Sequence, residues 1–222
     1  MAYERKFKIG KPILEVNNIS LSFGGVKAIT DTSFNVLEHE VRAIIGPNGA
    51  GKSSMLNCIN GIYKPQQGSV SFRGKQIPNI TPNIMAQMGL SRTFQNLALF
   101  KRMSVLDNIL VGRKLHTKTN FLEVALQLPK VKKEEKLNRD RSEEIISFLE
   151  IEDIKDTPVG KLPYGLQKKV ELGRALATDS TIILLDEPMA GMNVEEKRDM
   201  CRFILKVNDE LGTTMVLIEH DM

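Results

Sequence analysis

Three segments in the first third of the chain alternate apolar with polar residues, as half-buried β-strands do. They are residues 13–23 (ILEVNNISLSF), 30–38 (TDTSFNVLE) and 68–77 (GSVSFRGKQI), the last with a turn expected at Arg73 and Gly74. A period of two places every second side chain on the same face of a sheet. The pattern therefore predicts antiparallel strands that together form a β-rich lobe.

Three further segments are short and mostly apolar, a pattern typical of strands that are covered on both faces. They are residues 41–45 (VRAII), 181–187 (TIILLDE) and 213–220 (TTMVLIEH), and we expect them to form a parallel core sheet. Residues 103–150 are instead helical in pattern and rich in charge. A run of mixed charge such as the one within residues 128–150 is typical of a solvated helical face.

These segments predict an α/β chain that forms one folded unit with an insertion, and the composition is consistent with that size. The 222 residues, 41% of them apolar, suffice for one sizeable core. The net charge of +4 is small and does not imply nucleic acid as a partner.

The first ten residues are too charged for a secretory signal, and no apolar run approaches the ~18 residues that cross a bilayer. Cys58 and Cys201 lack paired or metal-type spacing, so we expect buried free thiols and a reducing compartment.

The strongest chemical signal follows the apolar segment 41–45. Residues 46–53 read GPNGAGKS, and a helical pattern then runs to about Gly61. Glycines let backbone N–H groups curl around a phosphate, and the helix start adds its dipole. Lys52 is expected to reach the β- and γ-phosphates, and the Ser53 hydroxyl to bind Mg²⁺. The residues expected at this triphosphate site are Gly46, Pro47, Asn48, Gly49, Ala50, Gly51, Lys52, Ser53 and Ser54.

A second apolar segment, residues 181–187, ends in two acidic residues. Asp186 is expected to hold Mg²⁺ through water, and Glu187 to polarise an attacking water molecule. The alternative is a strand that merely ends in acidic residues before Pro188.

The order of these motifs along nearly the whole chain resembles that of the ATP-binding cassette (ABC) ATPases. The motifs that follow the phosphate loop are RTFQN (92–96), LPYGLQKKVELGRALA (162–177), IILLDEP (182–188), AGMN (190–193) and IEHD (218–221). Within that superfamily, LSFGGVKAI (21–29), SRTFQNLALFKRMSVLDNILVG (91–112) and the Tyr-Gly signature look like the ATPase subunits of branched-chain amino acid (Liv-type) importers. Urea and short-amide importers have closely similar subunits, so that alternative stays open. A regulatory nucleotide-binding module with little turnover is a second alternative.

The resemblance implies a P-loop NTPase core with a mostly parallel sheet, an antiparallel β lobe and an inserted helical subdomain. The expected boundaries are about 1–95 and 160–222 for the core and β lobe, and about 96–159 for the helical subdomain. Family members usually continue beyond the histidine of IEHD, so we expect that a C-terminal part of the family fold is missing. The implied location is cytoplasmic, on the inner face of the cell membrane. The implied partners are a second ABC ATPase subunit, transmembrane permease subunits and an extracytoplasmic solute-binding protein, with no nucleic acid.

The resemblance also implies ATP and Mg²⁺ as cofactors and assigns roles to individual residues. The catalytic residues would be Glu187, Gln95 and His220, and the metal ligands Ser53, Gln95 and Asp186. Phe23 would stack on adenine with help from Val26, and Asn193 would belong to the D-loop. The signature Leu162, Pro163, Tyr164, Gly165 and Leu166 would face the ATP of the partner subunit in a head-to-tail dimer.

Two details of these motifs concern the efficiency of ATP hydrolysis and the docking of the transmembrane subunits. The usual Leu-Ser-Gly-Gly-Gln signature has become Leu-Pro-Tyr-Gly-Leu, which lacks the serine hydroxyl and one backbone donor. An apolar group, Leu97, Leu99, Phe100 and Met103, follows Gln95. The resemblance implies that this group receives short helices of the transmembrane subunits, and the alternative is that it belongs to the core of the helical lobe.

Overall fold

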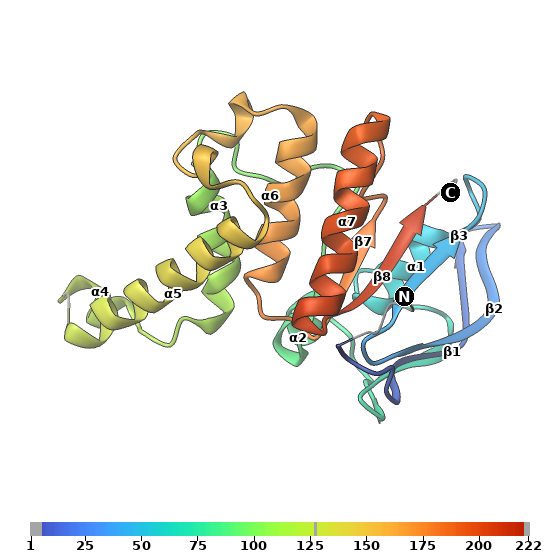
Figure 1. Cartoon of the computed structure of the whole chain (residues 1–222). Coiled ribbons are helices and arrows are strands. Elements are labelled where there is room, and N and C mark those ends of the chain that lie inside the picture. The colour runs from blue at the N-terminus through green and yellow to red at the C-terminus, as the bar shows by residue number, and fades with distance from the viewer. Residues whose placement is uncertain (1–5, 127, 220–222) are drawn as a thin grey trace. The chain divides into compact units, whose positions relative to one another are not determined.

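The computed structural model in Figure 1 describes residues 6–126 and 128–219. The chain divides into two units, the first made of Met1–Gln95 and Thr181–Met222 and the second of Asn96–Ser180. The first unit contains both predicted sheets, and the second contains the predicted helical insertion. The mixed α/β fold class is therefore confirmed.

The antiparallel sheet of the first unit has the strand order β2-β1-β4-β5. Its strands are β1 (Pro12–Phe23), β2 (Val26–Leu37), β4 (Gln67–Phe72) and β5 (Lys75–Gln76). The turn between β4 and β5 has positive φ angles at Arg73 and Gly74, 51° and 71°, as the tight turns of two-residue hairpins require. The alternation of apolar and polar residues thus predicted this lobe correctly.

The parallel sheet has the order β3-β8-β7-β6. Its strands are β3 (Val41–Ile45), β8 (Thr214–Glu219), β7 (Ile182–Asp186) and β6 (Leu90–Arg92). All five residues of β7 are buried, as its continuous apolar run predicted. The helices of this unit are α1 (Lys52–Ile59), α2 (Pro82–Met88) and α7 (Val194–Leu211).

The prediction for β3 was wrong in one respect, because this strand is not covered on both faces. Its residues are half-buried or exposed, and Ile45 keeps 45% of its surface accessible. β3 lies at the edge of the sheet and, within the described residues, pairs only with β8. An apolar run alone does not distinguish a central strand from an edge strand.

The second unit is helical and contains α3 (Val105–Gly112), α4 (Phe121–Ala125), α5 (Pro129–Phe148) and α6 (Tyr164–Leu176). Three 3-10 helices accompany them, at Arg113–His116, Glu152–Ile154 and Val159–Lys161. A Cβ on Gly112 would lie 2.3 Å from the carbonyl oxygen of Arg174, so α3 approaches α6 closely where it ends. Since α6 packs on α3, this unit extends to Ser180 and not to the boundary expected near residue 159.

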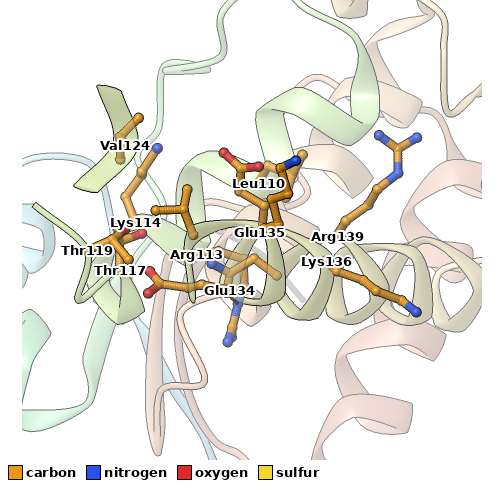
Figure 2. A pocket seen from close by; sticks show the side chains of 13 residues that line it. Leu110, Arg113, Lys114, Thr117, Thr119, Val124, Glu134, Glu135, Lys136 and Arg139 are labelled. Carbon is orange, nitrogen blue, oxygen red and sulfur yellow. Dashed lines mark hydrogen bonds between the residues drawn. The ribbon is translucent and has the colours of Figure 1, made fainter. Parts of the chain in front are cut away.

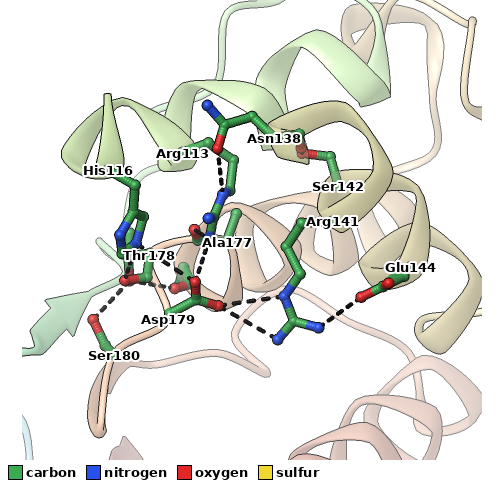
Figure 3. A network of polar contacts seen from close by, with 11 residues as sticks. Arg113, His116, Asn138, Arg141, Ser142, Glu144, Ala177, Thr178, Asp179 and Ser180 are labelled. Atoms are coloured by element: carbon green, nitrogen blue, oxygen red, sulfur yellow. Dashed lines mark hydrogen bonds and ion pairs between the residues drawn. The ribbon is translucent and has the colours of Figure 1, made fainter. Parts of the chain in front are cut away.

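A polar network closes the second unit where α6 ends (Figure 3). Asp179, which has a φ of 48°, accepts hydrogen bonds from both Arg113 and Arg141. The Nε2 atom of His116 lies 3.6 Å from the same carboxylate. The network joins the segment after α3, the helix α5 and the end of the unit, and so supports the turn at Asp179.

The two cysteines differ in exposure, which corrects the prediction that both are buried. Cys58 on α1 is buried, and burial raises the pKa of its thiol to about 11. Cys201 is exposed, because it lies beside the buried stripe of α7 that includes Met200 and Ile204. Both thiols are free. No helix of the described ranges is long and apolar enough to cross a membrane.

Candidate active site

The predicted phosphate loop lies between β3 and α1 in the first unit. Gly51 is the N-cap of α1 with φ 80° and ψ 8°, a left-handed conformation that suits glycine. A Cβ at this position would lie 2.2 Å from the carbonyl oxygen of Ala28, so a larger residue does not fit. Residues 47–50 are exposed, and no side chain caps the helix start. The backbone N–H groups of this loop are thus placed to receive an anion.

Lys52 brings a positive charge to the same loop. Its side chain is buried, and the Nζ atom donates to the carbonyl oxygens of Gly46 at 2.5 Å and Pro47 at 2.9 Å. The ammonium group is therefore held over the loop by backbone contacts. Such a position lets Lys52 interact with a phosphate chain bound in the loop.

Ser53 and Asp186 face each other from α1 and β7. The Oγ atom of Ser53 donates to Oδ1 of Asp186 at 3.3 Å, and the aspartate side chain is 4% exposed. A hydroxyl and a carboxylate are hard oxygen ligands of the kind that Mg²⁺ prefers. Among the described residues, no three His, Cys, Asp or Glu side chains form a metal-binding group.

Arg92, at the end of β6, is a site residue that the sequence analysis missed. Its Nη2 atom lies 2.7 Å from Oδ2 of Asp186, and its Nη1 atom donates to Oδ1 of Asn57 at 2.6 Å. The Arg92 and Asp186 side chains are only 5% and 4% exposed. Its place in RTFQN, three residues before Gln95, was the one available signal. Pairing with an acidic residue almost a hundred positions away could not be read from that motif alone.

Two of the three predicted catalytic residues, Glu187 and Gln95, are in direct contact. The Nε2 atom of Gln95 donates to Oε2 of Glu187 at 2.8 Å. Glu187 is 5% exposed and has a φ of 49°, which is uncommon for a residue with a side chain. Its N–H donates to the carbonyl oxygen of Ile218 on β8 at 3.1 Å, which helps to hold this conformation. Strained backbone of this kind is frequent at functional sites.

The predicted adenine-stacking residues lie at the turn between β1 and β2. Phe23 is 47% exposed and Val26 is 70% exposed, so both present apolar surface to solvent. Phe23 also contacts Tyr63 edge to face, with ring centroids 5.1 Å apart and an interplanar angle of 75°. An aromatic ring that is braced on one side and exposed on the other suits stacking on a flat ligand.

The signature motif lies in the second unit, at the start of α6. Pro163 is the N-cap residue, with φ −53° and ψ 152°, and no side chain caps the helix. Leu162 and Gly165 are buried, Leu166 is half-buried, and Pro163 and Tyr164 are exposed. The accessible part of this motif is therefore its proline and tyrosine.

Asn193 and His220 are the remaining predicted site residues, and only Asn193 lies among the described residues. Asn193 is the N-cap of α7 and forms a capping box, in which its side chain accepts from the Glu196 N–H and the Glu196 side chain accepts from the Asn193 N–H. This arrangement gives Asn193 a structural task in addition to the expected D-loop role. His220 lies outside the described residues.

A separate cavity of about 580 Å³ lies in the second unit, against α3 and α5 (Figure 2). Its lining is strongly charged and includes Arg113, Lys132 and Glu134. None of the predicted site residues lines it.

A comparison with protein families shows the family of this chain. The family model described as ABC transporter matches residues 29–190, which include the phosphate loop, the signature and both acidic residues. This chain belongs to the ABC transporter ATPases. It is an ATPase homologous to the ATP-binding subunits of branched-chain amino acid transporters, and ATPases of this family bind nucleotide.

Several curated proteins are similar over most of their length. The branched-chain amino acid transport ATP-binding protein BraF of Pseudomonas aeruginosa is 36% identical over 96% of this chain and 84% of its own. LivG of Escherichia coli is 33% identical over the same shares. LivG of Methanocaldococcus jannaschii is 36% identical over 94% of this chain and 80% of its own.

Solved structures confirm the fold. The ADP conformation of MJ1267, an ATP-binding cassette of an ABC transporter, has a TM-score of 0.82 and 36% identity, and the match covers 95% of this chain and 82% of that one. The dimeric cassette MJ0796 with ADP and phosphate has a TM-score of 0.75 at 24% identity, with 94% and 88% coverage, and supports the fold alone.

Proposed function

We propose that this ABC ATPase drives an importer of branched-chain amino acids. The observation that carries the proposal is the convergence of Lys52, Ser53 and Asp186 on one loop in a chain whose curated relatives are branched-chain amino acid transport subunits. The relatives supply the substrate class, and the geometry supplies the means to hold a nucleotide with its metal.

In this proposal each group at the site has one task. The exposed loop N–H groups and Lys52 bind the phosphates of ATP, and Phe23 stacks on the adenine ring with Val26 beside it. Ser53, Asp186 and Gln95 would hold Mg²⁺, which would supply positive charge to the bound triphosphate. Glu187 orients and polarises the attacking water, and His220 contributes at the γ-phosphate.

The signature residues act in a dimer. At the uncapped start of α6, the exposed Pro163 and Tyr164 and the backbone N–H of the buried Gly165 face the γ-phosphate bound by a second ABC ATPase subunit, in a head-to-tail arrangement. Closing and opening of this dimer drives transmembrane permease subunits, to which an extracytoplasmic solute-binding protein delivers the amino acid. The chain thereby works in the cytoplasm, on the inner face of the membrane, and does not act on nucleic acid.

Uptake by the reconstituted transporter tests the proposal. Proteoliposomes that contain this subunit with its permease partners and binding protein should accumulate leucine, isoleucine and valine only when MgATP is supplied on the ATPase side. Lys52→Ala should abolish this uptake, because it removes the charged contact to the phosphates.

The same preparation distinguishes the alternatives. Uptake of urea or short amides, with none of branched-chain amino acids, would replace the proposed substrate class. Equal uptake by the parent and the Lys52→Ala variant would contradict the proposed phosphate site itself.

A further inference from the structure

We propose that Arg92 is a positioning residue that holds Asp186 in the orientation that the metal requires. The inference deepens the proposed function, since it rests on the proposed metal site of Ser53 and Asp186. It concerns a residue that neither the motifs nor the comparisons assign to the site.

The two oxygen atoms of Asp186 have different partners. Oδ1 accepts from the Ser53 hydroxyl at 3.3 Å, whereas Oδ2 lies 2.7 Å from Nη2 of Arg92. The guanidinium thus engages the oxygen that does not face Ser53. With Oδ2 held in this way, the carboxylate presents Oδ1 toward the serine, where the metal would bind. Partners that orient a metal-binding carboxylate typically change metal affinity 10- to 100-fold when they are replaced.

Arg92 is itself fixed from a second side. Nη1 donates to Oδ1 of Asn57 at 2.6 Å, and Asn57 lies on α1 one turn after Ser53. Arg92 lies on β6 and Asp186 on β7, so one guanidinium joins three elements of the site. Among the described residues its Nε atom has no hydrogen-bond partner, so the two Nη contacts are its polar anchors, and the guanidinium also lies 5.2 Å from the centroid of the Phe94 ring. The planar fork of an arginine fixes the directions of two separate N–H groups, whereas the donors of a lysine share one nitrogen and do not impose that geometry on the two partners.

If Arg92 acted only through its charge, its replacement would change metal affinity differently. A cation 2.7 Å from the carboxylate repels a second cation. If charge were all that mattered, Arg92→Lys would leave the metal affinity unchanged, and Arg92→Met would strengthen it. If positioning matters more, both variants weaken metal binding. The sign of the change therefore separates the two roles.

Manganese titrations of the full chain loaded with ADP, followed by electron paramagnetic resonance, test the inference. ADP is used so that ATP-driven dimer formation does not contribute. We expect Arg92→Lys to raise the Kd for Mn²⁺ about tenfold. The affinity for ADP in EDTA should change less than twofold, because the contacts that bind ADP without a metal belong to the phosphate loop. Asn57→Ala should weaken Mn²⁺ binding in the same direction by a smaller factor, since it releases one end of the guanidinium.

Two further variants give the reference points. Arg42→Lys alters another arginine–carboxylate pair of the first unit, with Glu40 at 2.9 Å, and should leave the Kd for Mn²⁺ unchanged. Asp186→Asn should weaken Mn²⁺ binding strongly. An unchanged Kd for Mn²⁺ in Asp186→Asn would contradict the proposed metal site. If Asp186→Asn binds Mn²⁺ weakly but Arg92→Lys binds it with the parental affinity, only the proposed role of Arg92 is overturned. Stronger Mn²⁺ binding in Arg92→Met would also overturn it. If Arg92→Met does not fold, Arg92→Lys and Asn57→Ala decide the matter.

Discussion

Glu187 combines an uncommon backbone conformation with a buried side chain. Its φ of 49° and its burial direct the carboxylate toward Gln95, which donates to it at 2.8 Å. The observation favours a functional interpretation of the second acidic residue in IILLDEP.

Replacement of Glu187 by glutamine separates binding from chemistry. The amide oxygen of the new side chain can still accept from Gln95, so we expect the local structure and the affinity for ATP to be retained. Hydrolysis should slow by roughly 10² or more, the scale of lost general-base catalysis. Phosphate release and nucleotide affinity measured on the same preparation check both parts.

Glu195→Gln is a matched control for that variant. Glu195 lies in the first turn of α7 and is exposed, so the same chemical change there should leave turnover at the parental rate. Parental turnover in Glu187→Gln as well would remove Glu187 from the mechanism.

At the residue scale, the sequence predicted groups that are close along the chain or share a motif. The phosphate loop of residues 46–53 was read directly, because its glycines and its lysine lie in one segment. The pairing of Arg92 with Asp186 was not, since it depends on two strands that are adjacent only in the folded sheet. The sequence analysis also missed the capping box of Asn193, because this residue was assigned only to the D-loop. Glu196, three residues after Asn193, is the sequence signature of such a capping box.

At the scale of elements, the helix starts fall into two kinds. Thr81, Ser104 and Asn193 cap α2, α3 and α7 with their side chains. The helices α1 and α6 begin at Gly51 and Pro163 without such a cap, and their first N–H groups are available to an anion. α5 also lacks a side-chain cap, so the missing cap alone does not make a site. For α1 and α6 the glycine loop and the signature motif supply the additional evidence.

Substitutions of Pro163 test whether the start of α6 meets a phosphate. Serine would add a hydroxyl and an N–H, and a hydrogen bond to a charged group contributes about 1.5–3 kcal/mol before desolvation. We expect Pro163→Ser to tighten the MgATP-dependent dimer and to raise basal hydrolysis several-fold. Sedimentation and phosphate release at saturating MgATP measure the two effects.

Pro163→Ala is the control for that experiment, because it removes the ring without adding a hydroxyl. The observed φ of −53° is one that proline favours, so rigidity is the competing explanation for this residue. A dimer no stronger than the parent in Pro163→Ser, with a weaker one in Pro163→Ala, would favour rigidity and contradict our expectation.

At the scale of the whole molecule, the class of each segment was easier to predict than its surroundings. β7 was recognised as a buried strand from IILLD, and all five residues are buried. β3 has an equally apolar sequence but lies at an edge, and its exposure depends on which strands flank it. The extent of the second unit was underestimated for a similar reason. The packing of α6 against α3 follows from the close approach at Gly112, which cannot be inferred from helical periodicity.

We propose that the group of Leu97, Leu99, Phe100 and Met103 contacts the permease subunits. Phe100 is 51% exposed, whereas Leu97, Leu99 and Met103 are half-buried, so a core role does not account for the phenylalanine. The backbone at this position is fixed by buried Asn108. Its Oδ1 accepts from the Phe100 N–H at 2.9 Å, and its Nδ2 donates to the Phe100 carbonyl oxygen at 3.1 Å. The phenyl ring is therefore an exposed apolar group on an ordered loop, as a docking surface requires.

Phe100→Asp should uncouple transport from hydrolysis. Because the Asn108 contacts involve only the backbone of Phe100, we expect the variant to fold and to keep its basal ATPase rate. Amino acid uptake by proteoliposomes and stimulation of hydrolysis by the permease should both fall at least tenfold, since a charge placed in an apolar contact is costly to desolvate. Asp107→Asn, an exposed change on the first turn of α3, is the control and should transport normally. Parental uptake in Phe100→Asp would place the docking surface elsewhere, and a variant that unfolds would show that the phenylalanine belongs to the core after all.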